Sequence, residues 1–112
     1  MAMPTQESTI NSMQGAADRM GLDLEDLQEM IGDVLDDCNS KSALLREAVV
    51  SKNAADVKAI AHDIKGSTAN YGLQEVSDIA YRLEKNNEDP ALADIDEMIA
   101  LLTHISTLNL IG

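Results

Sequence analysis

Apolar residues recur at three- and four-residue steps along most of the chain, and this spacing limits the fold more than any other feature. The clearest stripe consists of Leu24, Leu27, Ile31, Val34, Leu35, Cys38, Leu45 and Val49. The spacing matches the turn of an amphipathic helix, which Asp23 is expected to cap and which should run to about Ser51. No segment alternates apolar and polar residues over the length of a strand, and only 2% of the residues are aromatic. The sequence therefore predicts an all-α fold.

Four further helices are predicted from shorter stripes and from residues that start or stop helices. The first ends at Gly21, because glycine favours helix C-termini. Another begins after Asn53 and ends or bends at Gly72, where the next stripe starts. The dipeptide Asp89-Pro90 is expected to cap and open the last helix. The members of these stripes are Ile10, Met13, Ala17 and Met20; Val57, Ile60, Ala61, Ile64, Thr68 and Tyr71; Leu73, Val76, Ile79, Ala80 and Leu83; and Ile95, Met98, Ile99, Leu102 and Ile105.

These helices fit a single domain. Four principal helices with short connections predict an antiparallel up-down four-helix bundle over residues 22–112, preceded by a short N-terminal helix and its cap over residues 1–21. A chain of 112 residues supports one modest core, and each stripe is about wide enough for one core, so a monomer is expected. Cys38 is the only cysteine and lies on the core stripe, which predicts a buried, unreactive thiol. Because the sequence shows neither a leader nor a long apolar run, we expect a cytoplasmic protein without a membrane partner.

The charge of the chain is strongly acidic and unevenly distributed. Twenty acidic and eight basic side chains give a formal net charge of −12. Such a chain would repel a phosphate backbone, so no nucleic-acid partner is expected. Residues 38–65 form the only net-positive stretch, with five bases and three acids. This stretch would attract an acidic pocket of another protein, and the rest of the chain would repel it.

The two histidines are the candidates for chemistry, since most acidic side chains lie on faces that meet water. A di-metal site in a bundle uses Glu-x-x-His pairs, and neither histidine has a glutamate three positions before it, so no metal site is expected. At about 100° per residue, His62 falls about 140° from Val57 and points away from the core stripe. His104 also lies opposite its stripe, but no lysine or glycine is within reach, so we interpret it as an ordinary exposed histidine.

Small residues and lysines surround His62 on its exposed face. The small residues are Ala59, Gly66 and Ala69, and Lys58 and Lys65 lie along one side. A glycine in an exposed helix costs about 1 kcal/mol relative to alanine, and its use here would be to let another protein approach the ring. Lys65 can place an ammonium group beside a negative group that the imidazole carries, and Lys58 could assist.

The residues around His62 match a known signature. The run His62-Asp63-Ile64-Lys65-Gly66-Ser67, followed by Gly72 and Leu73, resembles the His-x-x-Lys-Gly-Ser signature of histidine-containing phosphotransfer (HPt) domains. The ending Arg82-Leu83-Glu84 of the next helix also looks like this family. The resemblance covers about residues 24–108, and the role of residues 1–20 stays open.

The resemblance implies a four-helix bundle that carries a phosphoryl group in two-component phosphorelays. When the roles of the matching motif positions are carried over, the resemblance implies that His62 is the phosphoacceptor, Lys65 stabilises the phosphoryl group and Gly66 keeps the face open. Ser67 matches the motif, and a hydrogen bond back to a helix carbonyl is its suggested role. The implied partners are a response-regulator receiver domain, which would hold the Mg²⁺ ion, and a histidine kinase. The chain itself is expected to bind no cofactor and, without a nucleotide-binding loop, to have no catalytic activity alone.

Three alternatives stay open at this point. The chain could dock a receiver or a kinase without carrying phosphate, although the histidine, lysine and glycine all argue against this. It could be the phosphoacceptor domain of a kinase, with the donor in the same polypeptide. A phosphocarrier of the sugar-transport type is disfavoured, because those folds contain a sheet. Exposed apolar residues near Ala59, Ala69 and Met20 are candidates for further docking surface.

Overall fold

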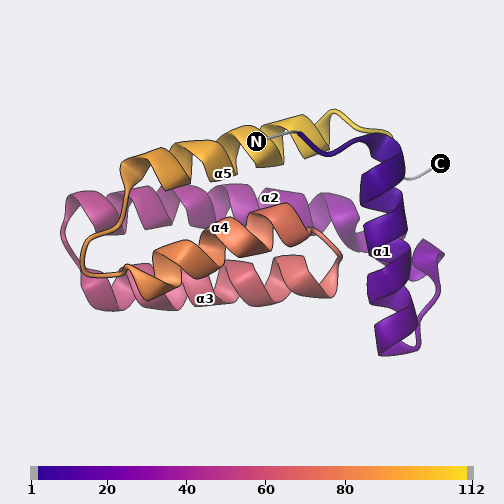
Figure 1. Ribbon diagram of the computed structural model, residues 1–112, viewed down its shortest axis with the longest axis horizontal. Coiled ribbons are helices and arrows are strands. Elements are labelled where there is room, and N and C mark those ends of the chain that lie inside the picture. The colour runs from indigo at the N-terminus through magenta and orange to yellow at the C-terminus, as the bar shows by residue number, and fades with distance from the viewer. Residues whose placement is uncertain (1–2, 111–112) are drawn as a thin grey trace.

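The protein is a helical bundle with one helix lying across its end. The computed structural model describes residues 3–110, which form five helices and no strand: α1 (Gln6–Met20), α2 (Leu24–Val50), α3 (Ala54–Asn70), α4 (Gln74–Lys85) and α5 (Leu92–Ser106). In Figure 1, α2 to α5 lie side by side in alternating directions, and α1 crosses the end at which α2 begins. The predicted antiparallel bundle with an extra N-terminal helix is confirmed.

The extra helix shares the core of the bundle. Met13, Ala16 and Ala17 of α1 are buried in the same apolar cluster as the residues of the other four helices. The outer limits of the two predicted parts, residues 1 and 112, lie outside the described residues, and the division at residue 21 stays a prediction. Within residues 3–110, no helix is long and apolar enough to cross a membrane.

Most helices begin and end where the predicted capping residues stand. Gly21 ends α1 with a φ of 70°, a left-handed conformation that glycine adopts without strain. Asp23 is the N-cap of α2, and its amide donates to the Asp26 carboxylate at 3.0 Å. The Asn53 side chain accepts a hydrogen bond from the Asp56 amide at 3.2 Å and caps α3. These bonds satisfy amide groups that have no partner within the helix.

The last helix begins later than predicted. Ala91 is the N-cap of α5, with an extended backbone and no side-chain hydrogen bond, and the helix begins at Leu92. Residues 86–89 form a turn at the end of α4, in which the Asp89 amide donates to the Asn86 carbonyl at 3.0 Å. Because Asp89 belongs to that turn, the chain needs two more residues before α5 can start. The prediction of Asp89-Pro90 as cap and first residue was therefore wrong by two residues.

Most of the core consists of residues of the predicted apolar stripes, but Leu101 and Leu110 are buried without belonging to any of them. The fully buried large side chains are Met13, Leu27, Leu45, Ile64, Leu73, Ile79, Leu83, Ile95, Met98, Leu101, Leu102 and Ile105. Cys38 is also buried, as predicted, and burial followed by the nearby Asp37 charge raises the pKa of its thiol to about 11. Met20 departs from the prediction, because it is 42% exposed. It is the last residue of α1, whose C-terminal end projects past α3 in Figure 1.

One close backbone contact between α1 and the bundle lies at Gly72, in the turn between α3 and α4. Gly72 is buried and has a φ of 77°. A Cβ atom at this position would lie 2.7 Å from the Met13 amide nitrogen and closer still to the Ser12 carbonyl oxygen. The backbone of α1 therefore approaches the turn more closely than any side chain would allow. This gives Gly72 a packing role as well as a conformational one.

His104 is not the exposed histidine that the sequence predicts. Its side chain is half-buried, and its Nε2 lies 2.7 Å from the carbonyl oxygen of Pro4, a distance at which the ring donates a hydrogen bond. Pro4 is buried just before α1. Periodicity within one helix does not reveal this contact, because it joins residues a hundred positions apart.

Candidate functional site

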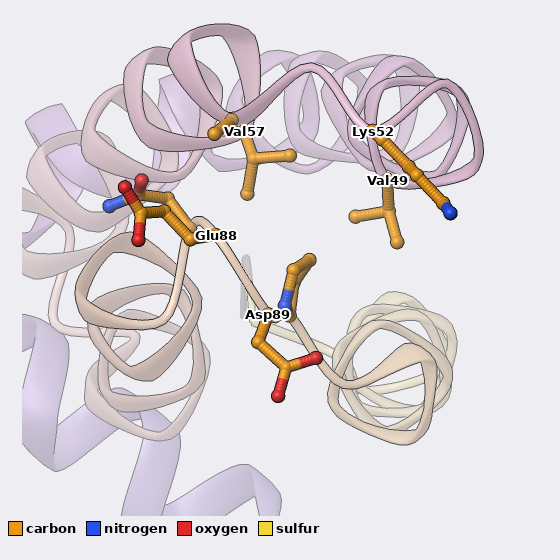
Figure 2. Close-up of a pocket in the computed structure, with 8 residues that line it drawn as sticks. Val49, Lys52, Val57, Glu88 and Asp89 are labelled. Carbon is orange, nitrogen blue, oxygen red and sulfur yellow. The ribbon is translucent and has the colours of Figure 1, made fainter.

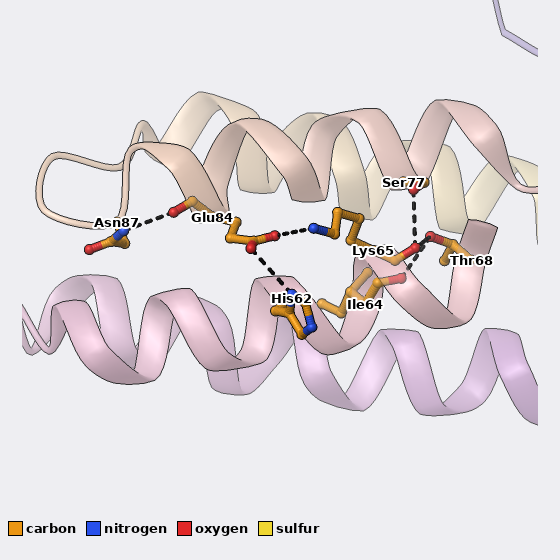
Figure 3. A network of polar contacts seen from close by, with 7 residues as sticks. All are labelled: His62, Ile64, Lys65, Thr68, Ser77, Glu84 and Asn87. Carbon is orange, nitrogen blue, oxygen red and sulfur yellow. Dashed lines mark hydrogen bonds and ion pairs between the residues drawn. The ribbon is translucent and has the colours of Figure 1, made fainter. Parts of the chain in front are cut away.

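His62 lies on the exposed face of α3, as predicted, with 64% of its side chain exposed. Its Nδ1 atom lies 3.2 Å from Oε1 of Glu84 on α4 (Figure 3). An ionised carboxylate only accepts hydrogen bonds, so Nδ1 must carry the donated proton. In the neutral ring the lone pair therefore belongs to Nε2, which points away from Glu84 in Figure 3.

Glu84 also binds Lys65, so one carboxylate joins His62 and Lys65 of the motif. The Lys65 ammonium lies 2.7 Å from Oε2 of Glu84, whose side chain is only 13% exposed. Hydrogen bonds from Lys65 and, less strongly, from His62 hold the pKa of Glu84 below its ordinary value, although burial opposes them. Glu84 is therefore ionised at neutral pH. Lys65 was predicted beside the imidazole, and the structure brings the two together through this carboxylate.

Two hydroxyl groups bond to backbone carbonyls beside these residues, one between α4 and α3 and the other within α3. The Ser77 hydroxyl of α4 donates to the Lys65 carbonyl of α3 at 3.1 Å (Figure 3). The Thr68 hydroxyl donates to the Ile64 carbonyl at 2.7 Å. The bond back to a helix carbonyl that was suggested for Ser67 is thus made by its neighbour Thr68. Among the hydrogen bonds within residues 3–110, Ser67 has no side-chain bond that would give it a role.

The side chains of Arg82, Leu83 and Glu84, in the last turn of α4, point in three directions. Arg82 pairs with Glu97 of α5 at 3.0 Å, on the side away from the His62 site. Leu83 is fully buried in the core. Glu84 faces α3, and its backbone carbonyl accepts a hydrogen bond from Asn87 at 2.8 Å, which ties the end of the helix to the following turn. Of the three, only Glu84 belongs to the site.

Glu84 was given no role from the sequence, although its spacing from His62 indicates that the two residues pair. His62 lies eleven residues before Leu73 and Glu84 lies eleven residues after it. Leu73 stands in the turn of the hairpin that α3 and α4 form. Residues at equal distances from the turn of an antiparallel helical hairpin lie opposite each other, so this symmetry could have paired the two.

The surface around His62 is open where small residues were predicted. Gly66 is exposed, and a Cβ atom there would meet nothing within 4 Å. Ala59 is exposed, whereas Ala69 is half-buried and contributes less to the opening than predicted. Next to the ring is a hollow of about 540 Å³ lined by Ala55, Lys58, Ala59, His62, Asp63 and Glu84. Lys58 is exposed beside this hollow and touches neither ring nor carboxylate in the described hydrogen bonds and ion pairs.

An apolar patch lies beyond the C-terminal end of α3. Met20, Leu22 and Met30 are between 42% and 51% exposed. Together with Leu27 and Tyr71 they line a cavity of about 140 Å³, and the Tyr71 hydroxyl lies 3.5 Å from the Met30 sulfur. This is the Met20 region that the sequence suggested as docking surface.

A separate cleft lies at the opposite end of the bundle, where the α2–α3 and α4–α5 connections meet (Figure 2). Its volume is about 370 Å³, and Val49, Lys52, Val57, Glu88 and Asp89 are among its lining residues. Carboxylate and ammonium groups are mixed here, and none of the motif residues lines it. The cleft therefore does not belong to the His62 site.

Comparison with known families agrees with this geometry. The Hpt domain model matches residues 29–108, which include all of α3, α4 and α5. Comparison with curated proteins and with solved structures gave no match. Hpt domains are phosphocarrier modules of two-component signalling that interact with response-regulator receivers and histidine kinases. Since the match spans more than two-thirds of the chain and contains the His62, Lys65 and Glu84 cluster, the chain belongs to the Hpt domain family.

Proposed function

We propose that this chain accepts a phosphoryl group on Nε2 of His62 and exchanges it with the aspartate of a receiver domain. The observation that carries the proposal is the orientation of the ring. Glu84 holds Nδ1 at 3.2 Å, and the opposite nitrogen points away from it on a helix face where the exposed neighbours Ala59 and Gly66 are small. In the neutral ring the unprotonated nitrogen carries a lone pair, and it is a nucleophile without a dedicated base.

The transfer itself requires positioning more than covalent chemistry from the chain. The Nε2 lone pair attacks the phosphorus of an aspartyl phosphate; the N–P bond forms, the O–P bond breaks, and the electron pair returns to the aspartate carboxylate. The ring gains positive charge in this step and keeps its Nδ1 proton, which Glu84 holds. A carboxylate on the far side of a histidine stabilises such an imidazolium. The reverse reaction uses the same contacts.

Lys65 and Gly66 have different parts in this proposal. The phosphoryl oxygens compete with Glu84 for the Lys65 ammonium, which neutralises charge in the loose transition state. Gly66 lies one turn from His62 and leaves room for the partner. Lys58 adds positive charge at the rim of the neighbouring hollow, and Ser67 is given no part. The apolar patch at Met20 lies past the end of α3 and is proposed as additional docking surface.

We assign the metal ion and the phosphoryl donor to the partner proteins. The Mg²⁺ ion is proposed to lie on the receiver, and a histidine kinase, separate or in the same polypeptide, is the other donor. The proposed location is the cytoplasm and the proposed state a monomer. The test is transfer of labelled phosphate from a phosphorylated receiver or kinase to the chain. Acid-labile, base-stable label supports the proposal, whereas a folded chain that binds a receiver and takes no label favours a docking module.

Replacing Gly66 with leucine is expected to slow transfer at least about tenfold, because the new side chain occupies the approach to His62. The free energy of unfolding should stay the same or rise by up to about 1 kcal/mol, since glycine is a poor helix former. Gly32→Leu is the matched control, because Gly32 is also an exposed helical glycine with no atom near its missing Cβ, but lies on α2. The transfer rate is measured with labelled phosphate, and the free energy of unfolding is measured by denaturant melts. Equal transfer rates for the two variants would contradict the steric role of Gly66.

Replacing Glu84 with glutamine is expected to change how stability depends on pH. The pKa of Glu84 is lowered in the folded chain, so its ionised form stabilises the fold above the ordinary value of 4.5, and this stabilisation is lost as pH falls below that value. The difference in the free energy of unfolding between wild type and Glu84→Gln should be constant near neutral pH and shrink below about pH 4.5. Denaturant melts from pH 7 to pH 3 measure it. A difference that grows on acidification would mean that the carboxylate is not stabilised by its partners.

A further inference from the structure

Tyr81 lies beside the cluster of His62, Lys65 and Glu84 and is not one of the motif residues. It lies on α4, it is 48% exposed, and two ammonium groups approach its ring. The Lys65 ammonium lies 5.4 Å from the ring centroid and the Lys85 ammonium 5.3 Å from it. Both distances are within the range of a cation–π interaction. The Lys65 ammonium thus has two contacts, the Glu84 carboxylate and the Tyr81 ring.

The position of the ring follows from the pairing of α3 with α4. Lys65 lies eight residues before Leu73 and Tyr81 eight residues after it, so the two face each other across the hairpin. The bond from Ser77 to the Lys65 carbonyl holds this register. From this starting point the Lys65 side chain runs between α3 and α4 to Glu84 (Figure 3). Tyr81 therefore lies at the side of the path that the ammonium takes.

We propose that Tyr81 is a positioning residue for Lys65: its ring keeps the ammonium between α3 and α4 when the phosphoryl group draws it away from Glu84. This inference rests on the proposed function of His62 and Lys65. The ammonium loses its carboxylate contact during transfer, and its long, flexible side chain could then turn into solvent. The ring contact does not depend on Glu84 and stays available. The inference concerns where Lys65 is held, and Tyr81 itself touches no reacting atom.

A double-mutant cycle tests this coupling. The rate constant of phosphoryl transfer from a phosphorylated receiver and the receiver concentration for half-maximal rate are measured for wild type, Tyr81→Leu, Lys65→Ala and the double variant. Tyr81→Leu is expected to lower the rate constant about two- to fivefold, as an exposed cation–π contact allows. The double variant should be no slower than Lys65→Ala alone. Tyr81→Phe, which keeps the ring, should restore the wild-type rate.

Several results would overturn the inference. Additive losses in the double variant would mean that Tyr81 acts without Lys65. A loss only in the half-maximal receiver concentration would make Tyr81 a docking contact, and equal losses for the leucine and phenylalanine variants would assign the effect to the hydroxyl. Lys85→Ala is the control for positive charge near the ring and should leave the coupling between Tyr81 and Lys65 unchanged. A wild-type chain that takes no label from receiver or kinase would overturn the proposed function itself, and with it this inference.

Discussion

Replacing His62 with glutamine is expected to reduce acceptance of labelled phosphate to background. Glutamine offers an amide in place of the Nε2 lone pair, and an amide nitrogen is not a nucleophile toward phosphorus. The fold should be unaffected, because the His62 side chain is 64% exposed and the glutamine amide can still donate to Glu84. Substitutions at such positions usually change the free energy of unfolding by no more than about 0.5 kcal/mol. Transfer of label, with circular dichroism on the same samples, measures both quantities.

The second histidine provides the matched control. His104→Gln keeps a side-chain donor for the Pro4 carbonyl and lies outside the cluster of His62, Lys65 and Glu84. It should therefore accept label at the wild-type level. Label on the His62 variant that equals wild type, or loss of label in the His104 variant, would show that the phosphoacceptor has been assigned to the wrong residue.

Replacing Gly72 with alanine is expected to lower the free energy of unfolding by about 2–5 kcal/mol. A left-handed backbone at a residue with a side chain costs roughly 1–2 kcal/mol, and forcing extra volume into a packed region adds about 1–3 kcal/mol. The new methyl group would meet the backbone of Ser12 and Met13, which cannot move without displacing α1. Because natural domains have only about 5–15 kcal/mol of stability in total, the variant should lose a large fraction of it. Thermal and denaturant melts measure the loss.

Gly21→Ala separates the two causes of this loss. Gly21 has a φ of 70°, close to the 77° of Gly72, but no atom lies within 4 Å of its missing Cβ. Its alanine variant should therefore lose only the conformational part, about 1–2 kcal/mol. Both substitutions lower the conformational entropy of the unfolded chain, which stabilises the fold by the same amount in each variant, so this effect cancels in the comparison. Equal losses in the two variants would mean that the contact between Gly72 and α1 contributes nothing to stability.

Short-range information in the sequence was enough for the helices and for the face that presents His62. Periodicity places His62 opposite Val57, and the exposed ring and open Gly66 surface follow from that phase. Two of the features that were missed depend on contacts between distant residues. Glu84 reaches the site through the pairing of α3 with α4, and the half-buried His104 ring contacts the carbonyl of Pro4, a hundred positions away. Asp89 was misplaced for a local reason, since a turn and a helix cap compete for the same residue types.

The close approach of α1 to Gly72 also has a consequence for the order in which contacts can form during synthesis. Ser12 and Gly72 are sixty residues apart, so α1 leaves the ribosome long before the turn that it packs against has been made. Only residues 21–23 separate α1 from α2, and the two helices pack against each other, so this local contact can form early. The backbone contact with Gly72 can form only after the turn between α3 and α4 has been synthesised.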